Sequence, residues 1–357
     1  MPSTKGLVLV TLFGFLPGRD VGSGATGFVG TAVTRAFIDA GYPVRGTARS
    51  QSKAQKWEGW QESEYKNKVD WAIVEDVIVP GAFKDAMKDI EFVVHTAAPF
   101  TIAFKDNEKD MLLPSIRGTE NILAAAKNEA SVKHMIITSS IAAVIDLLQG
   151  PRPGYTYTSK DWNPATYEQA VVSPIPPFVY CASKSLAEKL AWDDKERKFS
   201  LTTICPPTIY GPPHQPLDKM EHLNTSCAIV WSLINADDQS EIPATAFPVG
   251  VDVRDVAKLH VRAVDGYNGK AKEQRYLVIG FELFNSQAAQ IVRSTPEFAN
   301  FADRVRNGGG DIPHEHYGVD TKEAEALLGT SFVSAQQSIV DTARRLWELD
   351  GKLNKSA

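Results

Sequence analysis

Cysteine is scarce in this chain of 357 residues, which contains Cys181, Cys205 and Cys227 and no C-x-x-C pair. This spacing excludes a disulfide framework and a cysteine metal cluster, so we expect no metal site and a reducing compartment such as the cytosol. Long apolar runs are also lacking, because no stretch reaches the ~20 residues of a membrane span. An excess of one charge is absent too, since 38 Lys and Arg oppose 43 Asp and Glu. We therefore expect neither a nucleic-acid partner nor a membrane partner.

The apolar run from Leu7 to Leu16 follows Lys5 and imitates a short secretory signal, with small residues near Ala25 as a cleavage site. Cleavage there would remove GLVLVT (6–11), which the later pattern needs as a first strand. We therefore expect a cytoplasmic protein that keeps this segment.

Strand-like and helix-like segments alternate over the first 205 residues. Such alternation is typical of an α/β fold with a parallel sheet. The expected strands lie at 7–10, 42–48, 69–74, 92–97, 134–140 and 201–205. The expected helices lie at 28–41, 114–130 and 178–195.

The alternation loosens after Pro206. We therefore expect an α/β domain of Rossmann type with a doubly wound parallel sheet at 1–205. A smaller lobe at 206–357 would form the substrate pocket and return in part to the sheet. The segment 145–177 is rich in Pro, Gly, Tyr and Thr and is expected to be a long loop beside the active site. The clearest elements expected in the second part are helices near 219–237 and 321–329 and a strand at 275–280.

Three glycines, Gly24, Gly27 and Gly30, are spaced G-x-x-G-x-x-G directly before the helix expected at 28–41. Glycine allows backbone N–H groups to approach a pyrophosphate at φ angles that a Cβ would resist, and the helix N-terminus adds positive charge. A glycine-rich turn without a ligand is the alternative. A strand before the turn and a helix after it favour dinucleotide binding.

The second expected strand ends in Arg49, with Lys53 close behind and no acidic residue at the tip. An arginine fork binds a 2′-phosphate, which a carboxylate would repel, so the pattern predicts NADP(H). The alternative is that both residues are solvated surface cations. Asp76 is a candidate acceptor for the adenine amino group, and the small residues Ala97 and Ala98 leave room for the adenine ribose.

Tyr180 and Lys184 lie at positions i and i+4 of an expected helix and share its face. A nearby ammonium, together with the positive oxidised nicotinamide, favours the phenolate and lowers the tyrosine pKa from about 10. The same ammonium can hold the nicotinamide ribose. Ser139 and Ser140 end a strand at the edge where α/β sheets bind ligands, so a hydroxyl there can polarise a carbonyl. The alternative is that the serines cap a helix or form a turn.

Together these motifs resemble the extended short-chain dehydrogenase/reductase family. Within it they are similar to the dihydroflavonol-reductase-like branch, which includes fungal NADPH-dependent aldehyde, ketone and methylglyoxal reductases. The similarity covers nearly the whole chain. It rests on GATGFVG (24–30), VRGTARS (44–50), PSIRGT (114–119), IITSS (136–140), YCASK (180–184), PPTIYGP (206–212) and VDVRDVAKLH (251–260).

The resemblance implies an NADPH-dependent reductase of a small-molecule aldehyde or ketone, and we expect a monomer or homodimer. Ser140 would orient the carbonyl, Tyr180 would be the general acid, and Lys184 would hold the ribose and tune Tyr180. An epimerase, dehydratase or hydroxysteroid dehydrogenase on the same scaffold is the alternative enzyme. The residues that would bind NADPH/NADP+ are Gly24, Gly27, Phe28, Val29, Gly30, Arg49, Lys53, Asp76, Val77, Ala97, Ala98, Tyr180, Lys184, Pro206 and Ile209.

Two residues depart from the family pattern, since Cys205 and Ser115 stand where many members have Asn. Neither departure affects the proton donor. His214 and His260 attract attention as titratable groups, but we expect each to have a capping or surface role.

The larger departure is the segment LFGFLPGRDVGS, residues 12–23, between the first strand and the glycine turn. A loop beside the pyrophosphate, an artefact of the gene model and a shifted first strand all remain open. We favour an artefact-like insertion accommodated as a surface loop, because GLVLVT keeps a strand pattern. A binding protein whose catalysis this insertion has impaired is a further alternative.

Overall fold

The computed structural model describes residues 5–11, 25–96 and 104–354. The insertion at 12–23 lies outside the described residues, as do the three predicted cofactor residues Gly24, Ala97 and Ala98. Across the described ranges, no helix is long and apolar enough to cross a membrane.

The centre of the molecule is a seven-stranded sheet with the order β10-β7-β5-β4-β1-β2-β3, in which every neighbouring pair is parallel. The order reverses at the β1–β4 pair, and ligands of such sheets bind outside the carboxyl ends of strands at this switch point. The predicted α/β class with a doubly wound parallel sheet is confirmed. The strands are β1 (Val8–Thr11), β2 (Val44–Ala48), β3 (Val69–Ile73), β4 (Phe92–His95), β5 (His134–Thr138), β7 (Ser200–Cys205) and β10 (Gln274–Leu277).

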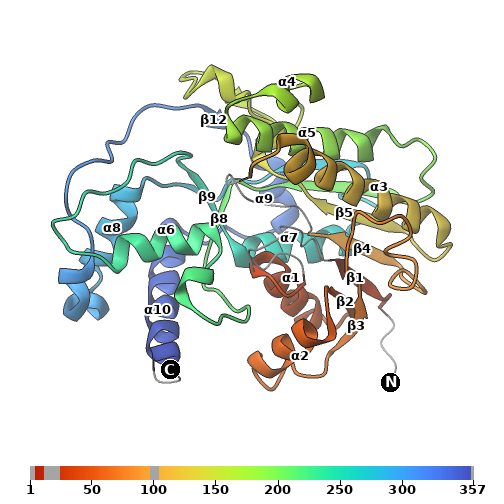
Figure 1. The fold of residues 1–357 in the computed structure, drawn as a ribbon, viewed down its shortest axis with the longest axis horizontal. Helices are drawn as coiled ribbons and strands as arrows, with labels where there is room; N and C mark the ends of the chain where they lie inside the picture. The colour runs from red at the N-terminus through yellow and green to blue at the C-terminus, as the bar shows by residue number, and fades with distance from the viewer. Residues whose placement is uncertain (1–4, 12–24, 97–103, 355–357) are drawn as a thin grey trace.

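Helices cover both faces of this sheet (Figure 1). Val8 and Val10 of β1 pack into the core beneath one pair of helices, whereas Leu9 packs into the core on the opposite face, as the two-residue period of a strand requires. The first pair is α1 (Phe28–Asp39) and α7 (Val253–Asp265), and the second is α3 (Leu113–Asn128) and α5 (Pro176–Asp193).

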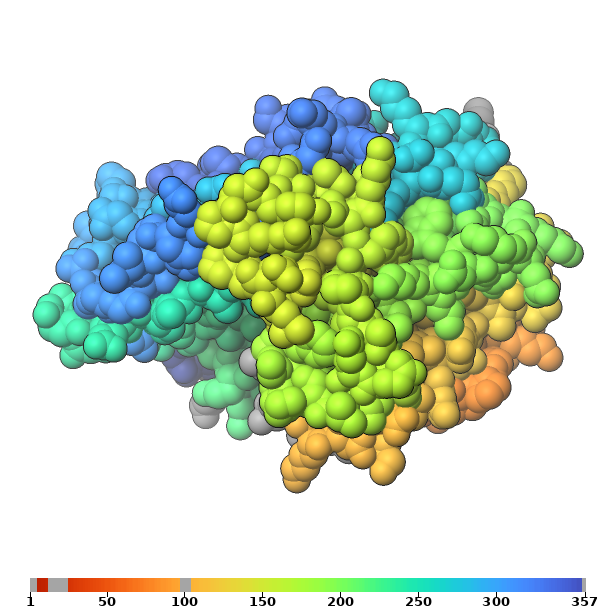
Figure 2. Space-filling model, turned by 90° about the horizontal axis from the view of Figure 1, so that it is seen from above, coloured from red at the N-terminus to blue at the C-terminus, as the bar shows by residue number. Residues whose placement is uncertain are grey.

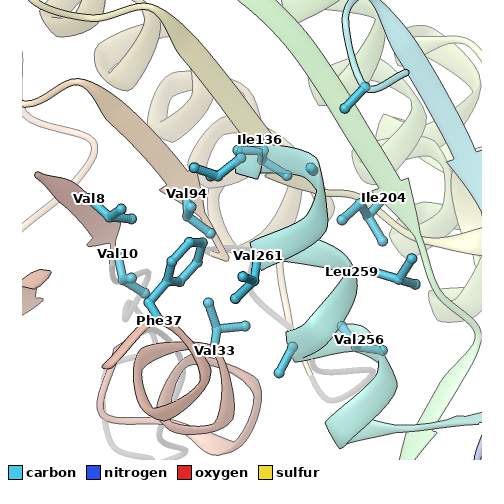
Figure 3. Close-up of a cluster of buried hydrophobic side chains, with 14 of the residues drawn as sticks. Val8, Val10, Val33, Phe37, Val94, Ile136, Ile204, Val256, Leu259 and Val261 are labelled. Carbon is cyan, nitrogen blue, oxygen red and sulfur yellow. The ribbon is translucent and has the colours of Figure 1, made fainter. Parts of the chain in front are cut away.

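Aliphatic side chains from the strands and from α1 and α7 build the first of these cores (Figure 3). Phe37 and Val33 of α1 are fully buried there, against Val8 and Val10 of β1. Helix α1 ends at Asp39, and Gly41 then adopts a positive φ of 78°, a conformation that glycine tolerates. The glycine turn and its helix are therefore anchored directly to the sheet.

A second cluster lies beside the sheet and contains helices that follow residue 205. Phe28, the first residue of α1, packs into this cluster with Tyr210, so the phosphate-turn helix contacts both parts of the molecule. The elements of this region are β8 (Thr208–Tyr210), η4 (Met220–His222), α6 (Thr225–Ile234), β9 (Val249–Asp252), β11 (Phe281–Glu282), α8 (Asn285–Ser294), η5 (Pro296–Arg304) and α10 (Ala335–Asn354).

The segment 145–177 is more structured than the loop we expected. It lies between the second cluster and α5 on the face shown in Figure 2. Its β6 pairs in parallel with β12, and α4 begins with a capping box at Thr166. The elements within this segment are η3 (Leu147–Gln149), β6 (Thr156–Tyr157) and α4 (Tyr167–Val172). Elsewhere in the described chain lie α2 (Gln51–Trp60), η1 (Glu108–Leu112), η2 (Ile141–Ala143), β12 (Gly318–Val319) and α9 (Lys322–Leu328).

Candidate active site

Helix α5 carries the predicted Tyr180 and Lys184 on one face, one turn apart. The helix begins at Pro176, and a second proline follows in the first turn, where the missing N–H groups cost no helical hydrogen bond. Because the helix covers the end of β5, Tyr180 and Lys184 lie beside the two residues that follow this strand.

The Ser140 side chain lies close enough to the Tyr180 hydroxyl to lower its pKa. Ser140 also caps η2, because its Oγ accepts a hydrogen bond from the backbone N of Ala142 at 3.1 Å. The serine therefore has the capping role considered from sequence and also contacts the tyrosine. Burial raises the pKa of Tyr180, while the Ser140 side chain lowers it. The phenol consequently stays protonated at neutral pH, with a partner positioned to stabilise the phenolate.

Lys184 is 6% exposed, and its Nζ donates a hydrogen bond to the carbonyl oxygen of Thr138 at 3.2 Å. Burial lowers the pKa of Lys184 to about 8, while the Glu188 carboxylate raises it. A cavity of about 10 Å³ lies against Lys184, Glu188 and Ser115. Ser115, one of the two departures from the family pattern, therefore faces α5.

A buried ion pair that the sequence reasoning missed joins Glu188 of α5 to Arg275 of β10. The guanidinium Nε lies 2.8 Å from Oε1 of Glu188, and the two residues are 2% and 8% exposed. Glu188 follows Lys184 by four residues and so lies on the Tyr180–Lys184 face. The four-residue spacing from Lys184 could have pointed to Glu188 in the sequence, whereas no sequence pattern indicated that Arg275 lies beside it.

His260 is fully buried, which corrects the expected capping or surface role. Its Nδ1 lies 2.8 Å from the carbonyl oxygen of Val256, and its Nε2 lies 2.8 Å from the hydroxyl of Thr138. Burial lowers the pKa of His260 to about 4, so the ring is neutral. His214 is half-buried, and burial lowers its pKa to about 4 as well. Neither histidine contacts Tyr180 in the described residues.

The N-terminus of α1 is built to receive an anion. Gly27 is its N-cap residue, and among the described residues no side chain caps this helix and its first turn holds no acid. The first backbone N–H groups are thus open to a phosphate. The predicted Phe28 directs its side chain into the second cluster, Val29 is half-buried at the border of both clusters, and Gly30 is buried within the helix.

Arg49 follows the last residue of β2 and is half-buried. Ser50 then caps α2 by accepting a hydrogen bond from the backbone N of Lys53 at 3.3 Å. The cap places Arg49 and Lys53 within one turn of each other at the tip of β2. Such an arrangement suits a phosphate ester, which binds both types of cation.

Asp76 and Val77, the two residues predicted to lie near the adenine, follow β3, but their side chains point in different directions. Asp76 is half-buried, and its Oδ1 accepts a hydrogen bond from the backbone N of Ile78 at 3.0 Å. Val77 is 2% exposed and packs into the core beneath α3, while its carbonyl accepts a hydrogen bond from Asn121 at 2.8 Å. The Val77 side chain is therefore committed to the core.

Pro206 lies beside the segment that follows Ser140, and Ile209 lies in β8. The carbonyl oxygen of Pro206 accepts a hydrogen bond from the backbone N of Ile141 at 2.9 Å, which brings Pro206 next to Ser140. Ile209 is half-buried in β8 between the two clusters. The predicted residues thus gather at two places along one edge of the sheet. Tyr180 of α5 lies near the ends of β5 and β7, and Arg49 lies at the end of β2.

A parallel sheet with a phosphate-ready turn at one place and a Tyr–Ser–Lys group at the other defines a Rossmann-type oxidoreductase. The chain belongs to the extended short-chain dehydrogenase/reductase family, in its dihydroflavonol-reductase-like branch. Residues 21–275 match the model of the 3-beta hydroxysteroid dehydrogenase/isomerase family.

Similar proteins span nearly the whole chain. An uncharacterized oxidoreductase of Schizosaccharomyces pombe is 38% identical over 91% of this chain and 96% of that protein. The NADPH-dependent methylglyoxal reductase of Saccharomyces cerevisiae is 34% identical over 93% of this chain and 98% of its own length. The crystal structure of the yeast methylglyoxal/isovaleraldehyde reductase complexed with NADPH superimposes with a TM-score of 0.83, at 31% identity, over 97% of this chain and 99% of that one.

Proposed function

We propose that this protein is an NADPH-dependent carbonyl reductase that converts an aldehyde or ketone to an alcohol. The observation that carries the proposal is the placement of Tyr180 and Lys184 one turn apart on α5, with the Ser140 hydroxyl close enough to Tyr180 to lower its pKa. The NADPH-dependent methylglyoxal reductase of yeast and a ketoreductase of Aspergillus niger, 31% identical to this chain over 91% of its length, support the same class of substrate.

The residues of the nucleotide end fit NADP(H). The first turn of α1 offers backbone N–H groups to a pyrophosphate, and Arg49 with Lys53 stands where a 2′-phosphate would lie. Asp76 is available beside the adenine. When bound, NADPH supplies the hydride. Arg49 would select NADPH over NADH, because its fork pairs with the 2′-phosphate.

Three side chains handle the carbonyl. Ser140 donates a hydrogen bond to the carbonyl oxygen and holds it beside the tyrosine hydroxyl, so charge that develops on oxygen meets an oriented donor. Tyr180 transfers its phenolic proton to that oxygen as the hydride reaches carbon, giving the alcohol. Lys184 binds the nicotinamide ribose and stabilises the resulting phenolate.

The protonation states support these roles. Burial raises the pKa of Tyr180, so the acid form that donates the proton is present at neutral pH. Lys184 remains charged below its pKa of about 8. The working state therefore combines a neutral phenol with an ammonium, and both exist together at neutral pH.

Purified protein mixed with NADPH and a panel of small aldehydes and ketones, methylglyoxal included, tests the proposal. We expect loss of NADPH fluorescence together with an equal amount of alcohol product. Tyr180→Phe keeps the ring and should lower kcat by about 10²–10⁴-fold. Absence of turnover across the panel, or full activity of Tyr180→Phe, would overturn the proposal.

The match to the hydroxysteroid dehydrogenase family model favours one second candidate, the oxidation of a secondary alcohol on the same Tyr–Lys pair. The same protein incubated with NADP+ or NAD+ and a 3β-hydroxysteroid distinguishes the two. Steroid turnover that exceeds aldehyde and ketone turnover would favour this candidate, and a preference for NAD+ would contradict the role of Arg49.

A further inference from the structure

The carboxylate of Glu188 lies directly behind the proposed catalytic residues. Glu188 is 2% exposed and sits one turn after Lys184 on the same face of α5. A buried carboxylate without partners is strongly destabilising, so the partners that surround this one show what it holds in place.

The two oxygens of this carboxylate together contact β7, β10 and the segment after β5. Oε2 accepts a hydrogen bond from Ser139 Oγ of the segment after β5 at 2.6 Å. Oε1 accepts one from Thr203 Oγ1 of β7 at 2.6 Å and pairs with Arg275 of β10 at 2.8 Å. Glu188 therefore fixes the catalytic helix to three neighbouring strands at the edge where the site lies.

Ser139 immediately precedes Ser140, and its backbone N also donates to the carbonyl oxygen of Ile204 at 2.7 Å. Arg275, on the other side of Glu188, donates a hydrogen bond to the carbonyl oxygen of Ala143 in η2 at 3.2 Å. Ser140 caps η2. The ion pair therefore holds the chain on both sides of Ser140.

Glu188 also provides the charge opposite Lys184. The other titratable groups around Lys184 are neutral at neutral pH. Burial lowers the pKa of His95 in β4 to about 3, raises the pKa of the Cys205 thiol in β7 to about 12 and raises the pKa of Tyr180 in α5. Arg275 of β10 is the other nearby cation, and Glu188 pairs with it. The Arg275 contact together with surrounding hydroxyls keeps the pKa of Glu188 low.

We propose that Glu188 is a positioning residue for the reduction, which holds Ser140 at the Tyr180 hydroxyl and keeps Lys184 charged. The inference rests on the proposed function, because it assigns a role to Glu188 through Ser140 and Lys184. It makes two separable claims, one about position and one about charge.

Two substitutions separate these claims. Glu188→Asp keeps the charge but shortens the reach to Ser139 and Thr203, so kcat should fall about 10–100-fold while the KM for NADPH and the pH profile stay unchanged. Glu188→Gln keeps the shape but removes the charge, so the alkaline limb of kcat/KM should move down by about one pH unit, a tenfold change in the protonation equilibrium.

The matched control is Glu273→Gln. Glu273 directly precedes β10 and pairs at 2.5 Å with Arg197, which follows the end of α5. The side chain of Glu273 is 40% exposed and does not contact the site. The control should keep the wild-type pH profile. If Glu188→Gln fails to fold because Arg275 is left unpaired, the double variant Glu188→Gln/Arg275→Met removes both charges and is measured in its place.

The charge claim has a readout that needs no turnover. The pH dependence of acetylation of Lys184, followed by mass spectrometry with the exposed Lys66 as an internal reference, should show a lower inflection in the charge-neutral variant than in wild type. Unchanged titration and pH profile in that variant, or an equal shift in Glu273→Gln, would overturn the charge claim. Wild-type kcat in Glu188→Asp would overturn the positioning claim.

Failure of the proposed function gives a different result. In that case wild type and Glu273→Gln both lack turnover on the whole carbonyl panel, while the Lys184 titration still decides the charge claim. Without turnover, the positioning claim also falls, because it concerns kcat. Active wild type with unaltered Glu188 variants instead rejects only the role of Glu188.

Discussion

The charged side chains at the two ends of the same sheet edge differ in how deeply they are buried. At the β5 end, Lys184 is buried and the carboxylate of Glu188 is enclosed by hydroxyls and a guanidinium. At the β2 end, Arg49 and Lys53 are half-buried around a helix N-cap. Solvent and salt screen charges at the second end, whereas burial at the first end shifts pKa values and makes position matter. The β5 end is suited to chemistry, and the β2 end to binding.

The largest effect that separates the two ends should come from Ser140→Ala. Loss of the hydroxyl removes the donor to the carbonyl oxygen, so kcat should fall about 10²–10³-fold, while the Kd for NADPH stays unchanged. Steady-state kinetics and calorimetric NADPH titration measure the two quantities. Ser185→Ala is the control, because this buried serine lies on α5, one residue after Lys184, but donates to the carbonyl oxygen of Asn163 at 3.2 Å. An effect of Ser140→Ala on NADPH affinity rather than on kcat would remove the distinction between the ends.

Next in size is Arg49→Ala. A charged hydrogen-bonded contact contributes about 1.5–3 kcal/mol, so the Kd for NADPH should rise about 10–100-fold, while kcat and the weak binding of NADH remain unchanged. High salt should weaken wild-type binding in the same direction. Arg45→Ala is the control within β2 itself, since Arg45 pairs with Asp70 of β3 at 2.7 Å, away from the tip of the strand. Equal loss of affinity in both variants would show a structural cause.

The pH profile should follow the buried end. Lys184 has a pKa of about 8, below the ordinary lysine value near 10.4, and a base loses its charge as pH rises through its pKa. We therefore expect kcat/KM to fall as the pH rises through about 8. The guanidinium of Arg49 keeps its charge over the same range, so NADPH selectivity over NADH should persist. A flat kcat/KM profile well into the alkaline range would contradict this prediction.

The smallest effect should come from Ser50→Ala at the exposed end. Loss of the N-cap of α2 should lower the free energy of unfolding by about 1 kcal/mol and raise the Kd for NADPH less than Arg49→Ala does. Urea denaturation and NADPH titration measure these changes. Thr166→Ala removes the comparable cap of α4, in which Thr166 Oγ1 accepts a hydrogen bond from the backbone N of Gln169 at 3.3 Å. It should lose similar stability without any change in Kd.

Much of this fold was predictable because local sequence patterns indicate where its strands lie. The seven strands of the central sheet correspond to the strand-like segments at 7–10, 42–48, 69–74, 92–97, 134–140, 201–205 and 275–280. The sequence analysis did not predict helices α7 and α10. The α7 sequence contains Asp, Arg, Lys and His, and its buried face becomes evident only when it packs against α1.

The site was predictable to the same extent. A helical spacing and a strand end predicted that Tyr180, Lys184 and Ser140 lie close together, as they do in the structure, and their catalytic roles stay predictions. The partner of Glu188 could not be found, because Arg275 is 87 residues away in the sequence. His260 was expected to have a capping or surface role, since a lone histidine carries no sign of the Thr138 hydroxyl, which donates a hydrogen bond to its Nε2 inside the core.

The position of Arg275 has a consequence for the order of folding. It lies in an edge strand, β10, which comes last in the sequence among the seven strands of the central sheet. During synthesis, α5 leaves the ribosome with Glu188 long before its cation exists, and the first 205 residues alone contain an unpaired buried acid. Pairing across so many residues is slow. We therefore expect nascent chains that end before β10 to remain bound by chaperones, with NADPH binding acquired only after this last strand docks.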